Sequence, residues 1–140
     1  MGGSGWWATG PYREDLAAAL RLAQELELKD DDHNSGGMTV DELWQDEEWQ
    51  EYILTGGTGS VLDQWRLIDA EAPDEEAMMR PLTDREVRTW APTGRPTVAE
   101  WVDALVTGTL EYPPRASGRC TVLHTDGHPS AIGYWGVTAD

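Results

Sequence analysis

Three Thr-x-x-Glu motifs constrain the fold of this chain more than any other feature of its sequence. They lie at Thr39–Glu42, Thr83–Glu86 and Thr97–Glu100. In each motif the Thr hydroxyl can accept a hydrogen bond from the backbone of the first helical turn, while the Glu carboxylate accepts one from the Thr amide. The motifs therefore predict helices that begin near residues 40, 84 and 98.

The spacing of apolar residues predicts how far the helices extend. An apolar stripe favours a helix from Pro11 or Tyr12 to about Leu28, since proline suits a first helical turn. After Thr39 two apolar stripes are displaced around the helix axis, which predicts either a bend or break near residues 46–48 or an aromatic side chain left partly exposed. The last two helices are expected over 84–90 and from 98 to about 106.

The terminal segment carries the strongest strand signal. Asp126-Gly127 is a typical two-residue turn, and it lies between the apolar segments 119–124 and 131–136. This pattern predicts a C-terminal β-hairpin, to which Trp6-Trp7 adds a short edge strand.

Two further strands are expected at 60–68 and 77–82, paired in antiparallel fashion across the acidic turn 73–76. Helices and strands joined by hairpin-length connections favour an α+β fold over a parallel βαβ fold. The sequence therefore predicts a single α+β domain over residues 1–140, with an antiparallel sheet of four to five strands and about four helices.

Net charge excludes some partners and favours others. The 140 residues carry a formal charge of −16, and residues 25–51 hold eleven acids against Lys29 alone, a local charge of −10. Nucleic-acid binding needs a basic surface, and anionic membranes also attract basic segments, so neither is expected as a partner. A concentrated acidic field favours a basic protein reached by electrostatic steering.

Two tryptophans lie inside the acidic segment, whereas Trp65, Trp90, Trp101 and Trp135 have the spacing of core residues. Aromatic side chains surrounded by charge are typical of binding hot spots. The alternative is that one or both of Trp44 and Trp49 cover the sheet. We therefore expect a protein-interaction module, of an inhibitor or immunity type, and no catalytic site. The expected partner-binding residues are Asp41, Trp44, Asp46, Glu47, Glu48, Trp49 and Glu51.

An alternative is a small-molecule binder or small enzyme with a Trp-lined pocket. Its polar groups would be Asp63, His124 and Tyr134. Asp63 is expected on an apolar strand face, where a buried carboxylate needs a partner. Arg66, Arg80 or Arg119 are the candidates for a structural ion pair.

A second alternative is a calcium-responsive domain that uses the loop 31–42. Its ligands would be Asp31, Ser35, Thr39 and Glu42, in the order of an EF-hand loop. His33 stands where an oxygen ligand is expected, and Glu42 also has the capping role, so an ordinary interhelical loop is the favoured interpretation. No cofactor is expected.

Three other motifs favour structural roles. Cys120 and His124 lie four residues apart on one expected strand, roughly 13 Å at ~3.3 Å per residue, which is too far for one zinc ion or for proton transfer. His128 lies at the turn of the hairpin. The glycine-rich segment 56–60 has no lysine after it and therefore lacks the basis of a phosphate-binding loop.

The segments Gly5-Trp6-Trp7, Gly59 to Asp63 and Val122 to His124 resemble small acidic hypothetical proteins of GC-rich bacteria. That resemblance implies a standalone domain and transfers no site or activity. The single cysteine, the absence of a basic and apolar leader at Met1–Gly5, and the lack of ~20 consecutive apolar residues predict a soluble cytoplasmic protein.

Overall fold

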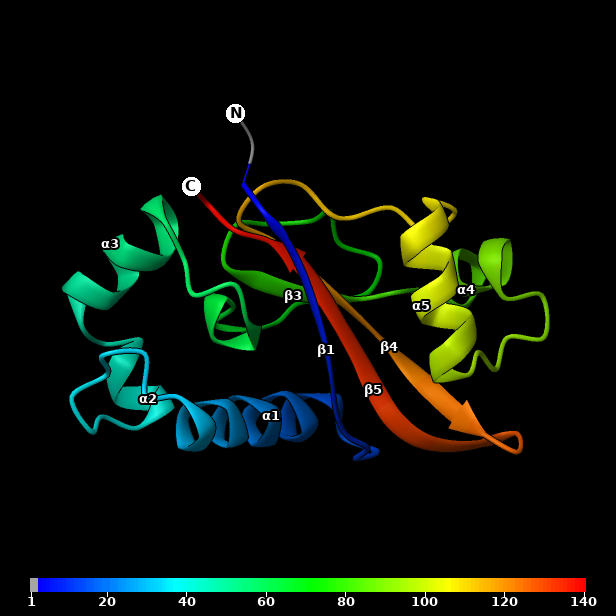
Figure 1. Cartoon of the computed structure of the whole chain (residues 1–140), viewed down its shortest axis with the longest axis horizontal. Coiled ribbons are helices and arrows are strands. Elements are labelled where there is room, and N and C mark those ends of the chain that lie inside the picture. Colours follow the sequence, from blue (N-terminus) through cyan, green and yellow to red (C-terminus); the bar gives the residue numbers. More distant parts are fainter. Residues whose placement is uncertain (1–2) are drawn as a thin grey trace.

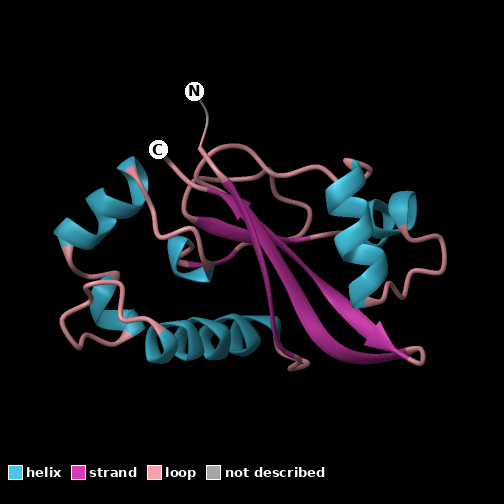
Figure 2. Cartoon of the chain, viewed as in Figure 1, coloured by secondary structure: helices cyan, strands magenta, loops and turns pink. Residues whose placement is uncertain are grey.

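The computed structural model describes residues 3–140, which form a five-stranded sheet in the order β1-β5-β4-β3-β2 (Figures 1 and 2). The strands are β1 (Gly5–Pro11), β2 (Arg66–Leu67), β3 (Met78–Pro81), β4 (Gly118–Thr125) and β5 (His128–Val137). The predicted α+β class and C-terminal hairpin are confirmed. Asp126 and Gly127 both have positive φ, at 52° and 77°, as the hairpin turn requires.

The sheet is mixed, so the prediction of an antiparallel sheet is wrong in part. β5 runs antiparallel to both β1 and β4, but β3 pairs in parallel with β2 and with β4. Two helices lie between β3 and β4, and this long connection returns the chain to the same end of the sheet. The segment 68–77 also returns the chain to the same end of the sheet, between the parallel strands β2 and β3, instead of making a tight turn.

The predicted strand 60–68 is also wrong. Val61–Asp63 is a 3-10 helix (η1), and only Arg66 and Leu67 pair as a strand. Ser60 caps η1, since its hydroxyl accepts a hydrogen bond from the Leu62 amide. The alternating apolar pattern therefore reflects a buried helical turn followed by a short edge strand.

All three predicted capping boxes are confirmed. They begin α2 (Val40–Leu43), α4 (Asp84–Trp90) and α5 (Val98–Thr107). α3 (Glu47–Thr55) starts after a break, which confirms the predicted interruption of the second helix.

The first helix begins later than predicted. α1 spans Leu16–Asp30, because Asp15 accepts hydrogen bonds from the Ala17 and Ala18 amides. Pro11 ends β1 instead of starting the helix. The described residues thus form five α-helices and one 3-10 helix, where about four helices were predicted.

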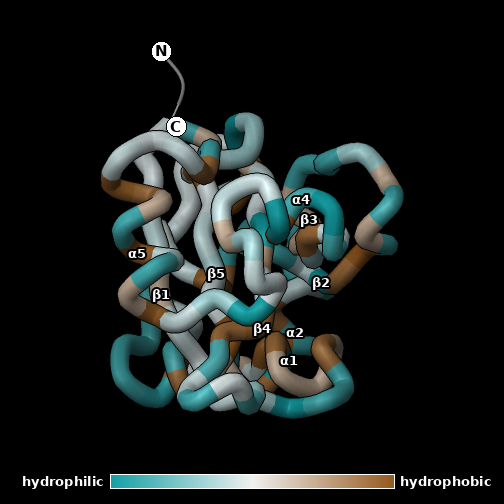
Figure 3. Tube along the Cα trace, turned by 90° about the vertical axis from the view of Figure 1, so that its right-hand side faces the viewer, coloured by the Kyte–Doolittle hydropathy of each residue, from teal (hydrophilic) through white to brown (hydrophobic). Residues whose placement is uncertain are grey.

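The sheet has α1 on one face and α4 with α5 on the other (Figure 1). Side chains along β5 point alternately to the two faces of the sheet, so the core has two parts. Ile132 and Tyr134 pack on the α1 side, whereas Trp135 packs with Trp101 of α5. Figure 3 shows brown apolar stretches on α5 and where β4 lies near α1, between teal polar loops. Within residues 3–140, no helix combines the length and the apolar character needed to cross a membrane.

A third cluster forms a separate lobe under α2 and α3. Its buried members are Val40, Leu43, Trp44, Trp49, Ile53, Leu62 and Ala77, and Leu28 of α1 packs against them. This lobe fixes the positions of the acidic helices, which lie beyond the end of α1 (Figure 1).

Candidate functional site

The acidic face, defined here as residues 25–51, comprises the end of α1, the loop after it, α2 and the first part of α3. Nine of its eleven carboxylate residues are exposed, and Glu27 and Asp46 are half-buried. The described residues give these acids few cationic partners. Arg21 pairs with Asp41, and His33 Nε2 lies 2.8 Å from Glu27 Oε2. Most of the local negative charge therefore faces solvent without a counter-charge.

Capping geometry orients α2 and α3 within this face. Asp46 Oδ1 accepts a hydrogen bond of 3.0 Å from the Glu48 amide, and the Gln50 side chain donates to the Trp44 carbonyl at 2.7 Å. A carboxylate at a helix N-terminus is favoured by the helix dipole, so Glu47 and Glu48 suit the first turn of α3.

Trp44 and Trp49 are buried, each only 6% exposed, so neither ring lies open on the surface of the acidic face. They close the lobe under α2 and α3, because the large rings cover apolar area that the short helices leave open. Trp65, which was predicted in the core, is instead 38% exposed. The Trp65 ring stacks on Trp44, with ring centroids 6.1 Å apart. Arg66 Cζ lies 3.9 Å from the centroid of the Trp65 ring.

A cavity of about 400 Å³, the α3 cavity, opens within the acidic face. Its apolar walls come from Met38, Leu43, Trp49 and Tyr52, and Asp46 and Glu48 supply its carboxylates. His33, Asn34, Ser35 and Gly36 complete the lining. Trp49 and Tyr52 meet edge to face with centroids 5.8 Å apart. Of the expected partner-binding residues, the structure thus gathers Asp46, Glu48 and Trp49 around one hollow, while Asp41, Glu47 and Glu51 lie exposed nearby.

The predicted calcium ligands have structural contacts. Thr39 Oγ1 accepts a hydrogen bond from the Glu42 amide at 3.2 Å, and Glu42 Oε1 accepts one from the Thr39 amide at 2.9 Å. Asp31 Oδ1 accepts from the His33 amide at 3.0 Å, and Ser35 is buried. No group of three or more acidic, His or Cys side chains within residues 3–140 is placed to hold a metal ion. The geometry thus gives the calcium hypothesis no support.

The three residues of the alternative pocket occupy different surroundings. Tyr134 is buried against α1 in the core, and burial raises the pKa of its hydroxyl. His124 Nδ1 lies 3.2 Å from the Pro96 carbonyl oxygen near the end of the hairpin. The cavity of about 380 Å³ beside His124 is lined by neither Asp63 nor Tyr134. The expected convergence of these groups is therefore not found there.

Asp63 holds the glycine-rich loop 56–60. Its Oδ1 accepts hydrogen bonds from the Thr58 amide at 2.7 Å and hydroxyl at 2.6 Å, and Oδ2 accepts one from Gly59 at 3.0 Å. No ion pair to Asp63 forms within residues 3–140, so the predicted salt bridge to an arginine is wrong. Burial raises the pKa of Asp63, and the hydrogen bonds from Thr58 and Gly59 oppose this shift.

Cys120 is a buried free thiol on β4, as the sequence predicts. Burial raises its pKa to about 12. A thiol that stays protonated at neutral pH is a poor nucleophile and metal ligand. Cys120 therefore fits a packing role.

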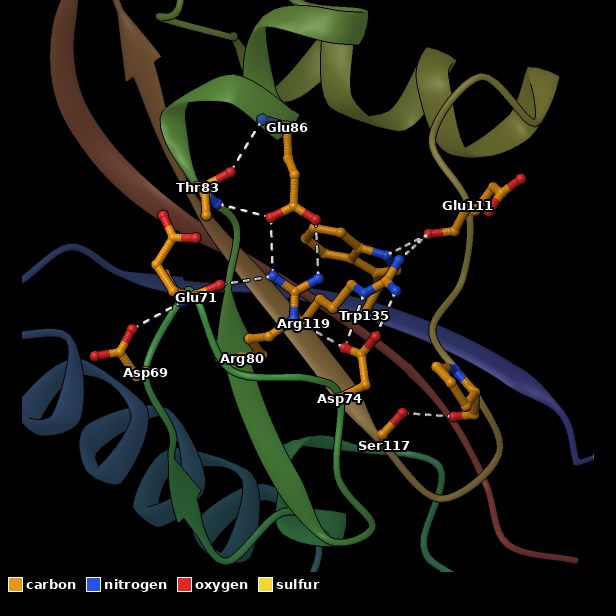
Figure 4. A network of polar contacts seen from close by, with 12 residues as sticks. Asp69, Glu71, Asp74, Arg80, Thr83, Glu86, Glu111, Ser117, Arg119 and Trp135 are labelled. Carbon is orange, nitrogen blue, oxygen red and sulfur yellow. Dashed lines mark hydrogen bonds and ion pairs between the residues drawn. The ribbon is translucent and has the colours of Figure 1, made fainter.

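A charged network that the sequence does not predict joins β3, β4, α4 and the segment 68–77 (Figure 4). Arg80 donates from Nη1 and Nη2 to Glu86 at 2.8 and 2.9 Å and from Nε to Asp74 at 3.1 Å. Arg119 donates from Nε and Nη2 to the same Asp74 carboxylate at 3.1 and 2.7 Å. Arg80 also donates to the Ala70 carbonyl at 3.0 Å, which fastens the segment 68–77 to the sheet.

The charges within this network cancel, because it contains two guanidinium groups and two carboxylates. Hydrogen bonds from Arg80 lower the pKa of Glu86 to about 2 against the effect of burial. Burial favours a raised pKa at Asp74, but hydrogen bonds from Arg119 and Arg80 outweigh it and hold this pKa below its usual value. Both guanidinium groups are already paired, so the network fits a structural clamp. The Thr83–Glu86 motif is the only sequence signal for this network. The contact between Asp74 and Arg119 joins residues 45 apart, so no local pattern predicts it.

The chain matches no known protein family model, no curated protein and no solved structure.

Proposed function

We propose that the protein is an interaction module that binds a basic protein partner through the acidic face, as an inhibitor or immunity-type protein does. The observation that carries this proposal is the group of exposed carboxylates on residues 25–51, where Lys29 is the only Lys or Arg. An extended surface of one sign raises the association rate with an oppositely charged partner and discriminates against acidic ones.

Part of this charge has no structural partner. Six of the eleven carboxylates cap helices, hold the loop or pair with Arg21 or His33, whereas Glu25, Asp30, Glu47, Glu48 and Glu51 form no side-chain hydrogen bond or ion pair with the described residues. The buried cluster under α2 and α3 holds both helices in place. Exposed like charges repel each other, so this arrangement costs some stability and is consistent with a surface selected for binding.

The test begins with proteins that copurify with the chain from the cells that make it. A basic protein recovered in this way is purified, and its association rate is measured at several salt concentrations. The face variant carries Asp46→Asn, Glu47→Gln and Glu48→Gln. Its matched control carries Glu71→Gln, Glu75→Gln and Glu76→Gln, three exposed acids outside the acidic face.

Both triple variants change the net charge from −16 by the same three units. We expect the face variant to associate about tenfold more slowly at low salt and to show a flatter salt dependence. The control should stay within about twofold of the natural chain. Equal effects of the two variants, or recovery of no basic partner, would contradict the proposal.

A further inference from the structure

We infer that the α3 cavity takes one arginine side chain of the basic partner. This inference rests on the proposed function, because it identifies the group that the acidic face recognises. The cavity combines two features that an arginine needs together: apolar and aromatic walls for the stem and the flat guanidinium, and carboxylates for its charge.

The carboxylates of the cavity are free to accept new hydrogen bonds. Asp46 uses Oδ1 to cap α3, but Oδ2 accepts no hydrogen bond from residues 3–140. Glu48 is exposed, and its carboxylate forms no ion pair or hydrogen bond with the described residues. Two carboxylate groups that line one hollow suit the fork of N–H donors on a guanidinium.

His33 is the one basic residue in the lining, and two carboxylates already lie beside its ring. Its Nε2 lies 2.8 Å from Glu27 Oε2 and 3.9 Å from Asp31 Oδ2. The electrostatic field in the cavity therefore favours a cation. Glu27 and Asp31 face His33, so Asp46 and Glu48 are the acids that remain for a ligand.

The aromatic walls favour arginine over lysine. Tyr52 is 45% exposed and Met38 is 38% exposed, so both offer apolar surface to an incoming side chain. Trp49 also lines the cavity, and its Nε1–H finds no acceptor within residues 3–140. A guanidinium already lies over an indole elsewhere in the chain, because Arg66 Cζ lies 3.9 Å from the centroid of the Trp65 ring, which stacks on Trp44. A planar guanidinium stacks on such rings, whereas an ammonium is a compact and strongly hydrated charge.

The volume agrees with one side chain. A cavity of about 400 Å³ is at the small end of ligand sites, which suits a single residue of a bound protein.

The test titrates three blocked tripeptides, acetyl-Gly-X-Gly-amide, into the ¹⁵N-labelled full chain. X is arginine, lysine or citrulline, the last being a neutral side chain with nearly the shape of arginine. We expect the arginine peptide to give saturable shifts at the Trp49 indole N–H and at the amides of residues 33–38 and 46–52. The lysine peptide should bind about threefold more weakly, and the citrulline peptide at least about tenfold more weakly.

Two variants examine the cavity itself. Glu48→Gln keeps the shape of the side chain and should weaken arginine-peptide binding about fivefold, whereas the control Glu76→Gln should leave it unchanged. Tyr52→Ala should weaken it by a similar factor through loss of the aromatic wall. Because Tyr52 packs against Trp49, the Glu48→Gln result decides the matter if Tyr52→Ala does not fold.

Equal binding of the arginine and lysine peptides, with shifts spread over all of residues 25–51, would overturn this inference. The proposed function would not be affected, because attraction between the acidic face and a basic partner does not require the cavity. Unchanged arginine binding in Glu48→Gln would overturn it as well. The proposed function fails independently if the face variant and its control bind the basic partner equally well.

Discussion

Replacing Glu86 by Gln tests the structural account through one ion pair. The substitution keeps the size of the side chain but removes the negative charge of the carboxylate, whose two oxygens accept hydrogen bonds from Arg80. The folded pKa of Glu86 lies at about 2 against an ordinary value of 4.5. Each pKa unit corresponds to about 1.4 kcal/mol, which gives roughly 3 kcal/mol in full. Because the side chain is 39% exposed, solvent screening reduces this to about 1.5–2 kcal/mol.

Glu100→Gln is the matched control. Glu100 occupies the same position of a Thr-x-x-Glu capping box and accepts a hydrogen bond of 2.9 Å from the Thr97 amide, but it forms no ion pair among the described residues. Glutamine is also found at this position of capping boxes, so the control should change the free energy of unfolding by less than about 0.5 kcal/mol. The difference between the two variants thus isolates the contribution of Arg80.

Urea unfolding followed by circular dichroism provides the assay. At pH 7 the midpoint of Glu86→Gln should fall by about 1 M urea, given slopes of about 1–3 kcal/mol/M for small proteins. Because the pKa of Glu86 is lowered in the folded state, the ion pair contributes its full stability above about pH 4.5 and loses it as the pH falls toward about 2. The natural chain and Glu86→Gln should therefore converge in stability over that range. Equal midpoints of Glu86→Gln and Glu100→Gln at pH 7, or a difference that does not change with pH, would show that the Glu86–Arg80 pair does not stabilise the fold.

Three further predictions follow from buried groups. Trp101→Ala should lower the free energy of unfolding by about 3–5 kcal/mol because Trp101 is fully buried, whereas Val106→Ala should cost less than about 0.5 kcal/mol because Val106 is 78% exposed; thermal unfolding of both variants checks this. Cys120 should react with an aromatic disulfide reagent at pH 8 at least about 100-fold more slowly in the folded chain than in guanidinium, and similar rates would contradict its burial. Asp63→Asn should destabilise the chain by about 1–3 kcal/mol, since an amide cannot accept all three hydrogen bonds from Thr58 and Gly59, and an unchanged urea midpoint would disprove this role. The raised folded pKa of Asp63 means that its contribution is greatest below the unfolded value of 3.8 and declines as pH rises through the folded value.

Sequence reasoning succeeded where the structure depends on neighbouring residues. The three capping boxes and the hairpin turn at Asp126-Gly127 are short patterns whose hydrogen bonds close within a few residues. The break between α2 and α3 was predicted from two apolar stripes displaced around the helix axis, a pattern that also lies within a few residues.

The errors arose where distant segments decide the outcome. Apolar alternation favoured a strand at 60–68, but the chain forms a 3-10 turn there, where Gln24 of α1 donates hydrogen bonds to the Val61 and Gln64 carbonyls. The segment between the parallel strands β2 and β3 is held at Asp74 by Arg119, a contact between residues 45 apart that has no local signature.

The sequence predicts an exposed acidic segment but not the cavity within it. Charge distribution alone placed it on residues 25–51, and the structure confirms that most of these carboxylates are exposed. Composition cannot show which tryptophans face inward, because Trp44 and Trp65 differ only in the packing around them. The α3 cavity likewise depends on how α3 packs beside the loop at 33–38.

The most direct test of the central claim is to map the surface that the basic partner covers. Hydrogen exchange of the full chain is measured with and without the copurified partner. If the partner binds the acidic face, the amides in residues 25–51 should exchange more slowly in its presence. Protection confined to the opposite side of the sheet, around Trp7 on β1 and Val106 on α5, would contradict the claim.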